Sequence, residues 1–481
     1  MHGNIKQVEK GKSMFDFLKK NDNELEERIK KLEKRIKKLE KKYAELEKSA
    51  NTVKDNSTYV ETTEVMGPMN GPEDKHPASI IASCYYLNSP LPRHAKCKCQ
   101  PSYYIGESTF DGKLETFVEI LGERLPELGE DENLESIFKR FNRKYKTQNN
   151  LIHTNTDLFV YFCDYMLFAK DRGFSHNDYF DYELYNKELD IRETFLNEGY
   201  RLRVYAACNK PGFRKYYSNK AKFNKKFKKY VKREWIDCSK CEYEVFEKFV
   251  NKHEVFFGKP VRGTGGEGAR VIERSSMPYD KLYEMCKAEE LILEEVIKQH
   301  PSLAAFNEST LNTVRVNTLV CADGEVRVTL AVARFGRAGN AVDNFHGGGV
   351  GAIVDIDSGV LITNAINRVH EKTDVHPDSQ KQVLGFKYPE WDKVKKAVTE
   401  AALMNPNARH VGWDVTVTNK GTVEFVEGNS RPNFDVLQSP DQLGRRFRYA
   451  PYIPEIEKLE GIEYVLEPLK ELDITGMETE D

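Results

Sequence analysis

Residues 412–431, GWDVTVTNKGTVEFVEGNSR, restrict the fold most, because two short alternating segments flank a tight turn. In the first segment Trp413 and Val415 point to one face of a strand, so Asp414 points to the other. Asn419 and Gly421 tolerate positive φ, which favours a hairpin turn between the segments. The segment therefore predicts a β-hairpin with Asp414 on its polar face.

The returning strand of this hairpin ends in two more oxygen-bearing side chains, Glu427 and Asn429. Strict alternation places Glu427 with the apolar Val423 and Phe425, but a strand end beside a glycine can re-aim a side chain, so parity leaves its direction open. Hard oxygen ligands of this kind suit Mg²⁺. The pattern is compatible with a magnesium site or with a surface hairpin that carries solvated acids.

Length and charge limit the class of protein. A chain of 481 residues is long enough for two or three domains. The 73 basic residues nearly balance the 76 acidic residues, so no general attraction to nucleic acid is expected. No segment approaches the run of about 18 apolar residues that a membrane-spanning helix needs, and the N-terminus lacks the apolar stretch of a signal peptide. We therefore expect a cytoplasmic protein.

Nine cysteines in a chain of this size are typical of reduced thiols. Two pairs, Cys97-x-Cys99 and Cys238-x-x-Cys241, can together supply four zinc ligands. They lie far apart in the sequence, and the first pair is unusually close. Ordinary cysteines remain the alternative to a structural zinc site.

A heptad repeat near the N-terminus predicts a coiled coil. Isoleucines at two of the three a positions and leucines at the d positions favour two parallel strands, and opposite charges at e and g agree with that pairing. A solvated single helix is the alternative. We expect a homodimer formed through residues 18–48. The apolar repeat consists of Leu25, Ile29, Leu32, Ile36, Leu39, Tyr43 and Leu46.

The remaining chain divides by composition. Residues 1–50 hold the coiled coil, and residues 51–78 form a polar linker rich in Gly-Pro pairs. Residues 79–217 show helical periodicity and no catalytic motif, and we interpret their dense aromatic residues as core or as a partner groove. Residues 218–450 carry the motifs described next, and residues 451–481 read as an acidic tail.

A glycine-rich segment at residues 262–270, RGTGGEGAR, follows the strand-like HEVFFGKPV. Its backbone amides can close over phosphate oxygens, and Lys259 supplies a positive charge beside them. It lacks the GK[ST] ending of a Walker loop and the helix of a dinucleotide fingerprint. We therefore predict a hairpin lid. Residues 219–235 predict a basic helix that is either a solvated amphipathic face or a nucleic-acid stripe.

Three further segments can complete a ligand site. The apolar strand at residues 291–297 carries two carboxylates and can line an adenine pocket. Arg315, Arg327 and Arg334 lie on two alternating strands and can project toward a cleft, where a guanidinium suits carboxylate or phosphate. In the glycine-rich loop at residues 343–349, His346 is an acid, a base, a substrate contact or a structural histidine.

The order of these parts resembles an ATP-grasp enzyme, and in particular the sugar-transfer-associated ATP-grasp family, over roughly residues 159–448. The resemblance implies an α+β fold in which two subdomains grip ATP. In the chain this fold follows the helical region and the parallel coiled coil that the apolar spacing predicts. At the ribose position the chain departs from better-understood ATP-grasp ligases, since His300-Pro301 stands where an acid is expected.

The resemblance also implies roles for individual residues. It places Lys220 and Lys259 on the phosphates, a glycine loop over them, an adenine hinge behind, two magnesium ions on the hairpin, and arginines at the transferred phosphoryl group. The loop comprises Gly263, Thr264, Gly265, Gly266 and Gly268; the hinge Glu294, Glu295, Val296 and Ile297; the metal ligands Asp414, Glu427 and Asn429; and the arginines Arg334 and Arg431. The strand and loop patterns add Arg315 and His346 as further catalytic candidates.

The implied reaction is a carboxylate–amine ligation: ATP phosphorylates a carboxylate, and an amine attacks the acyl phosphate to form an amide. The substrates implied are a sugar acid, an amino acid or a peptide. Two alternatives stay open: a kinase that uses the same grip on ATP, and a coiled-coil scaffold whose ATP-grasp domain only senses nucleotide.

Overall fold

The computed structural model describes residues 134–148, 151, 153, 158, 161–162, 164–166, 169–187, 189–263, 266–339, 343 and 348–462. All of them belong to one compact unit, Met66–Asp481. The predicted coiled coil at residues 18–48, its linker, the Cys97/Cys99 pair, Thr264, Gly265 and His346 lie outside the described residues.

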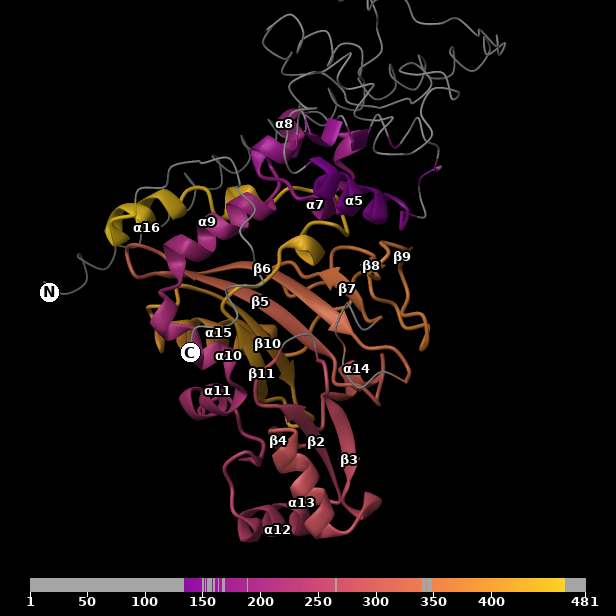
Figure 1. The fold of residues 1–481 in the computed structure, drawn as a ribbon, viewed down its shortest axis with the longest axis vertical. Helices are drawn as coiled ribbons and strands as arrows, with labels where there is room; N and C mark the ends of the chain where they lie inside the picture. The colour runs from indigo at the N-terminus through magenta and orange to yellow at the C-terminus, as the bar shows by residue number, and fades with distance from the viewer. Residues whose placement is uncertain are drawn as a thin grey trace, which may run out of the picture. The chain divides into compact units, whose positions relative to one another are not determined.

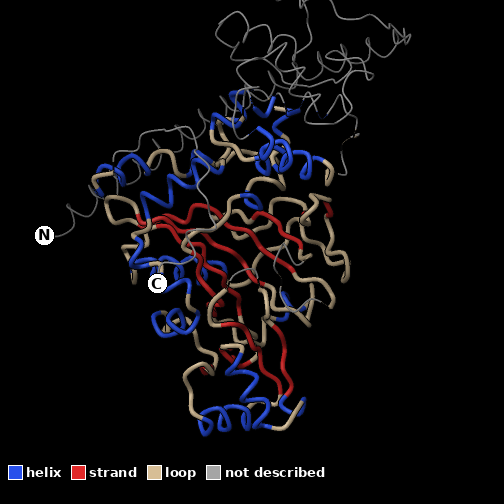
Figure 2. The backbone as a smooth tube through the Cα atoms, in the orientation of Figure 1, coloured by secondary structure: helices blue, strands red, loops and turns tan. Residues whose placement is uncertain are grey.

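Helices surround two antiparallel sheets (Figures 1 and 2). The helices are α5 (Leu134–Tyr145), α7 (His176–Asp181), α8 (Leu189–Arg192), α9 (Glu198–Cys208), α10 (Lys215–Ser218), α11 (Lys220–Lys226), α12 (Tyr243–Lys252), α13 (Tyr279–Ala288), α14 (Pro301–Ala304), α15 (Trp391–Leu403) and α16 (Ile453–Glu460). The strands are β1 (Trp235–Asp237), β2 (Val255–Pro260), β3 (Arg270–Glu273), β4 (Leu291–Glu295), β5 (Thr313–Val320), β6 (Val326–Phe335), β7 (Val350–Ile353), β8 (Ala365–Ile366), β9 (Lys372–Thr373), β10 (His410–Val417) and β11 (Val423–Asn429).

The larger sheet has seven strands in the order β11-β10-β5-β6-β7-β8-β9. Its central strands are buried on both faces. On one face Val316 of β5 and Trp413 of β10 share a core with Val398 of α15. On the other face Leu330 of β6 packs with Val204 of α9. Burial of both faces fixes the direction in which each strand's side chains point, because a one-residue slip would exchange the two faces.

The smaller sheet has four strands in the order β1-β4-β2-β3. Phe256 of β2 and Leu293 of β4 face α12 and α13 and form a core with Phe249 and Leu282. Since side chains alternate along a strand, the neighbouring residues of β2 and β4 point to the opposite face of the sheet. That opposite face carries the polar residues considered below.

The helical region ahead of the sheets has its own aromatic core, as the sequence predicted. Phe141 and Tyr179 are fully buried in a cluster of aromatic side chains. Inside it Arg192 makes a salt bridge of 3.0 Å with Asp164, which also accepts a hydrogen bond of 2.6 Å from the Tyr179 hydroxyl. Helix α5, Leu134–Tyr145, lies in the region whose periodicity predicted helices.

Two element predictions were wrong. The basic helix predicted at 219–235 ends at Lys226, because the backbone N–H groups of Lys232 and Arg233 turn toward the carboxylate of Glu424, at 2.9 and 3.2 Å. The acidic tail predicted from residue 451 begins with α16, whose Ile453 and Ile456 are fully buried in the core beside α9.

None of the helices in the described ranges has the length and apolar character needed to cross a bilayer.

Candidate active site

The glycine-rich segment connects β2 to β3, which pair antiparallel, so the expected hairpin is present. Gly263, Gly266 and Gly268 have φ values of 115°, 74° and 72°, a region that L side chains rarely adopt. The Nζ atom of Lys220 donates a hydrogen bond of 3.0 Å to the Gly263 carbonyl oxygen. A lysine from α11 therefore lies directly beside the loop.

The second lysine, Lys259, belongs to a buried chain of alternating charges. Its Nζ lies 2.9 Å from Oε2 of Glu294. Arg233 then bridges two carboxylates, with Nη2 2.8 Å from Glu294 Oε1 and Nη1 2.9 Å from Glu424 Oε1. Because Glu294 lies in the small sheet and Glu424 in the large one, Arg233 links the two sheets. Two cations and two anions make the chain neutral.

The Glu294 carboxylate is committed to this chain, and it also accepts a hydrogen bond of 2.9 Å from the Asn224 amide. Burial disfavours its charge, but Arg233 and Lys259 outweigh burial and lower the pKa of Glu294 to about 2. Beyond it, Glu295 and Val296 are exposed and Ile297 is half-buried. In the predicted adenine hinge, the Glu294 side chain is thus a partner of the lysine, while the following residues face outward.

The hairpin of β10 and β11 contains a β-bulge that decides where Glu427 points. Asp414 pairs with Glu427, whereas Val415 pairs with Phe425, so Val426 has no opposite residue in β10. The extra residue reverses the alternation beyond it. Glu427 therefore lies opposite Asp414, contrary to strict parity along the strand.

Asp414 is buried and held by two arginines. Arg315 of β5 contacts both carboxylate oxygens, through Nε to Oδ1 and through Nη2 to Oδ2 at 2.7 Å. Nη2 of Arg334 on β6 lies 3.0 Å from the same Oδ2. Burial opposes the negative charge, but Arg315 and Arg334 outweigh it and lower the pKa of Asp414 to about 2. The carboxylate is ionised at neutral pH.

The residues of the hairpin suit a magnesium ion by their chemistry. Asp414 and Glu427 face each other across the strands, and the Asn429 amide lies 3.3 Å from Glu427 Oε1. Two carboxylates and an amide oxygen are hard ligands that leave room for water and phosphate. In this arrangement arginine nitrogens balance the charge of Asp414. A metal ion would either share this carboxylate with the arginines or displace them from it.

Glu427 connects the two halves of the site. Its charge acts on Lys220 of α11, whose pKa is lowered by burial and raised in opposition by Glu427. The same carboxylate, after Asp414 and Asp343, helps raise the pKa of Arg334 against the effect of burial. Lys220 and Arg334 are therefore both close enough to Glu427 to interact with its charge, and Lys259 acts on Lys220 in the same way.

Three other residues singled out in the sequence, Arg327, Arg431 and His300, take no part in the contacts of Asp414, Glu427 and Asn429 given above. Arg327 lies at the opposite end of β6 from Arg334 and pairs with Glu325 at 2.6 Å, so its expected projection toward the cleft was wrong. Arg431 is exposed just beyond β11. His300 accepts a hydrogen bond from the Ser302 N–H and caps α14, which accounts for its place before Pro301.

The Cys238-x-x-Cys241 pair follows β1 of the smaller sheet, and Cys238 is fully buried with Cys286 in the core between that sheet and its helices. Within the described residues, no group of three or more His, Cys, Asp or Glu side chains is arranged to hold a metal ion. The thiols there are free cysteines. The described pair, Cys238 and Cys241, therefore gives the zinc hypothesis no support.

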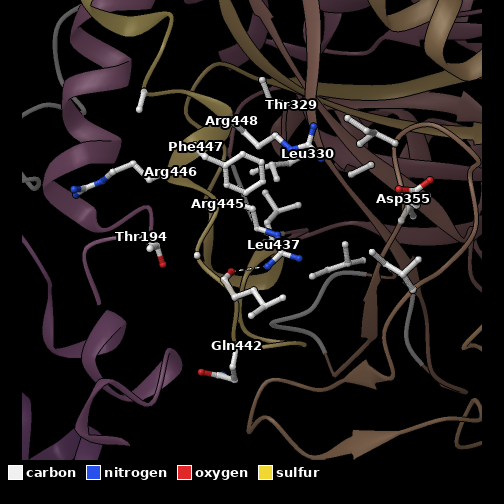
Figure 3. Close-up of a pocket in the computed structure, with 18 of the residues that line it drawn as sticks. Thr194, Thr329, Leu330, Asp355, Leu437, Gln442, Arg445, Arg446, Phe447 and Arg448 are labelled. Atoms are coloured by element: carbon white, nitrogen blue, oxygen red, sulfur yellow. Dashed lines mark hydrogen bonds between the residues drawn. The ribbon is translucent and has the colours of Figure 1, made fainter. Parts of the chain in front are cut away.

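Apart from the residues around Asp414, the described part of the chain has a hollow of about 600 Å³ along β6, away from Arg334 (Figure 3). Leu330, Leu437 and Phe447 contribute to a mainly apolar lining. Of its arginines, Arg445 is held by Asp441 at 2.7 Å and Arg448 lies over the Phe447 ring, 5.0 Å from its centroid. The hollow shares no residue with the cluster around Asp414.

Two residues of the site have no signature in the sequence. Thr313, at the start of β5, and Asp343, thirty residues later, are both buried beside Arg334. A threonine in a strand and an aspartate in a loop are common anywhere. Their part in the site is recognised only from their contacts in the folded structure, where Thr313 bonds to both Asp343 and Arg334.

Comparison with known protein families identifies part of the chain. Residues 229–449 match the model of the family described as sugar-transfer associated ATP-grasp. The resemblance inferred from the motifs is thereby confirmed over that segment, which contains both sheets and the residues around Asp414. Comparison with curated protein sequences gave no match.

Solved structures of ATP-grasp ligases and related synthetases are distantly similar. An ADP complex of N5-carboxyaminoimidazole ribonucleotide synthetase has a TM-score of 0.30 and 13% identity over 46% of this chain and 46% of that chain. The ATP-grasp ligase PsnB with a minimal precursor has a TM-score of 0.33 and 15% identity, covering 56% and 70%. The L-amino acid ligase from Bacillus licheniformis has a TM-score of 0.29 and 14% identity, covering 46% and 42%. The chain thus spans less than half of the length of the first and the third.

Proposed function

We propose that this protein is an ATP-dependent carboxylate–amine ligase that forms an amide through an acyl phosphate. One observation carries the proposal: two lysines and a glycine hairpin lie next to a pair of facing carboxylates, Asp414 and Glu427, and two arginines hold the first of these. Cations for the phosphates, hard ligands for a metal and donors for a transferred group are thereby gathered in one place. The match of residues 229–449 to an ATP-grasp family supports the same conclusion.

In this proposal the phosphates of ATP lie between the two sheets. Lys220 is beside the glycine hairpin at 3.0 Å, so its ammonium can follow the loop onto the phosphates. Lys259 is balanced by Glu294 at 2.9 Å and presents its remaining N–H groups to an anion. Positive φ at the loop glycines lets the backbone N–H groups approach the phosphate oxygens closely.

Asp414, Glu427 and Asn429 are the residues that would hold magnesium, which when bound would neutralise charge on the phosphate oxygens. Arg315 and Arg334 supply a fixed positive charge beside these carboxylates. A preorganised guanidinium stabilises negative charge that develops during transfer, because it needs no reorientation at that moment. We assign Arg334 and Arg431 to the transferred phosphoryl group or the acyl phosphate.

The reaction balances with the substrates alone. A carboxylate oxygen attacks the γ-phosphorus of ATP, the bond to the β-phosphate oxygen breaks, and ADP leaves. The amine nitrogen then attacks the carbonyl carbon, phosphate leaves, and a proton is released from the nitrogen. Closure of the glycine hairpin would exclude water, which otherwise hydrolyses the acyl phosphate. No nucleophilic side chain is required.

The experiment that tests the proposal supplies the full-length protein with Mg-ATP and with pools of carboxylates and amines, including sugar acids, amino acids and short peptides. Phosphate release that needs both a carboxylate and an amine, with a product lighter than their sum by one water, is the expected result. A product that carries a phosphoryl group and needs no amine would identify a kinase. Nucleotide binding without turnover under any pool would favour a sensing scaffold.

A further inference from the structure

Arg334 is the arginine whose position matters most to the proposed transfer, and it does not hold that position alone. It lies opposite Thr313 in the pairing of β5 and β6. Its Nε and Nη2 atoms donate hydrogen bonds of 3.2 and 2.8 Å to the Thr313 hydroxyl oxygen. The hydroxyl therefore accepts from two N–H groups along one edge of the guanidinium, which restricts the rotation of the Arg334 side chain.

The Thr313 hydroxyl is oriented by a third residue. Asp343 accepts a hydrogen bond from the Thr313 hydroxyl and one of 2.8 Å from the Thr313 backbone N–H, both on Oδ2. Because the hydroxyl proton is directed to Asp343, its lone pairs are left for Arg334. Thr313 and Asp343 are 2% and 7% exposed, so water does not compete readily for these bonds.

The three residues form a chain that ends on the hairpin of β10 and β11. Asp343 holds Thr313, Thr313 holds Arg334, and Arg334 Nη2 lies 3.0 Å from Asp414 Oδ2. The Asp343 carboxylate is also 3.9 Å from Arg334 Nη2, and the attraction between the opposite charges helps to hold the guanidinium in place. A residue outside the hairpin thus fixes where the guanidinium stands relative to Asp414.

We propose that Thr313 and Asp343 are positioning residues that hold the Arg334 guanidinium in place for the phosphoryl group transferred from ATP. The inference rests on the proposed function, since it presumes phosphoryl transfer at this site. Neither residue touches a substrate in this role. A misplacement of about 1 Å in a reacting arrangement costs roughly a hundredfold in rate, so the effect of losing the threonine hydroxyl is measurable.

The test compares Thr313→Val with Thr313→Ser in the full-length protein. Valine has nearly the shape of threonine but cannot accept from Arg334, whereas serine keeps the hydroxyl. The control is Thr329→Val, because Thr329 is an equally buried β6 threonine whose hydroxyl hydrogen-bonds to Tyr449 at 2.7 Å, away from the site. A general effect of removing a buried hydroxyl appears in both valine variants.

Two measurements make the comparison specific. The first is the affinity for ADP alone and for ADP with aluminium fluoride, which mimics the transferred phosphoryl group. We expect Thr313→Val to bind ADP within about twofold of the wild type and to lose about tenfold to a hundredfold for the aluminium fluoride complex. Thr313→Ser and Thr329→Val should match the wild type in both.

The second measurement is the kinetics of phosphate release from Mg-ATP, in which Thr313→Val should lower kcat and leave the KM for ATP nearly unchanged. If Thr313→Val equals the wild type, or if Thr313→Ser is as impaired as Thr313→Val, the positioning role is wrong. If the wild-type protein binds ADP in neither condition, the proposed function itself fails. The two failures are therefore distinguishable.

Discussion

Arg233 links the two sheets through a buried guanidinium, so its removal tests the structure of the site directly. Its side chain is 3% exposed and lies between Glu294 and Glu424, which are 4% and 2% exposed. We predict that Arg233→Met destabilises the protein strongly. Methionine fills much of the space but leaves two buried carboxylates without their shared cation.

The magnitude follows from what each carboxylate keeps. Glu294 retains Lys259 at 2.9 Å and the Asn224 amide at 2.9 Å. Glu424 retains only hydrogen bonds from backbone N–H groups, at 2.9 Å from Lys232 and 3.2 Å from residue 233. Breaking a buried ion pair by removing one partner costs about 3–5 kcal/mol, and Glu424 is the carboxylate left unpaired.

The assay is urea unfolding followed by tryptophan fluorescence. Trp235 lies two residues from Arg233 in the small sheet, and Trp413 lies in the large sheet. Separate transitions would mean that the sheets no longer unfold together, which is itself expected if Arg233 couples them. The double variant Arg233→Met with Glu424→Gln should recover part of the lost free energy, because the unpaired charge is removed.

Lys229→Met is the matched control, since Lys229 makes an ion pair with Glu400 on an exposed surface. Exposed pairs contribute about 0–1 kcal/mol. An Arg233→Met protein whose free energy of unfolding lies as close to the wild type as that of Lys229→Met would refute this account of the buried chain.

Three more predictions follow from the same structure. Glu427→Ala should lower ATP turnover by at least about a hundredfold while far-UV circular dichroism stays unchanged, because a carboxylate facing Asp414 is lost; full activity would remove Glu427 from the metal site. Burial lowers the pKa of His410 from 6.5 to about 4, so the unfolded chain takes up a proton at this residue before the folded protein does, and stability is lost as pH falls from about 6.5 to 4. His410→Phe, which keeps a ring, should make the free energy of unfolding less dependent on pH in that window by about 3 kcal/mol in total; equal pH profiles would count against it. Deletion of residues 1–50 should convert a dimer into a monomer in light scattering, and a dimer that persists would place self-association in the rest of the chain.

The sequence was most informative where a strand is buried on both faces. Alternation in β10 correctly placed the side chains of Asp414 and Trp413 on opposite faces of the strand, because both faces are covered and the pattern is strict. The direction of Glu427 could not be found in this way. The bulge at Val426 reverses the alternation of the residues that follow it, Glu427 included, and no residue type marks it.

Contacts across long separations were also beyond the sequence. The strand expected at 291–297 is present as Leu291–Glu295, whereas its role as an adenine hinge stays a prediction. The partners of its Glu294 could not be predicted, because Arg233 lies 61 residues earlier, and Arg233 is held in turn by Glu424, 191 residues after it in the chain. The use of Glu294 as a partner for Lys259 was not inferred either. The tail prediction failed because acidic residues masked the two buried isoleucines of α16.

The central claim is that a carboxylate is activated by ATP, and oxygen transfer tests it most directly. Carboxylate substrates labelled with ¹⁸O in both oxygens are incubated with the full-length protein, Mg-ATP and the amine pool, and the released phosphate is analysed by mass spectrometry. The account predicts one ¹⁸O atom in each phosphate formed together with amide. Phosphate that carries no label while amide forms would contradict an acyl phosphate intermediate.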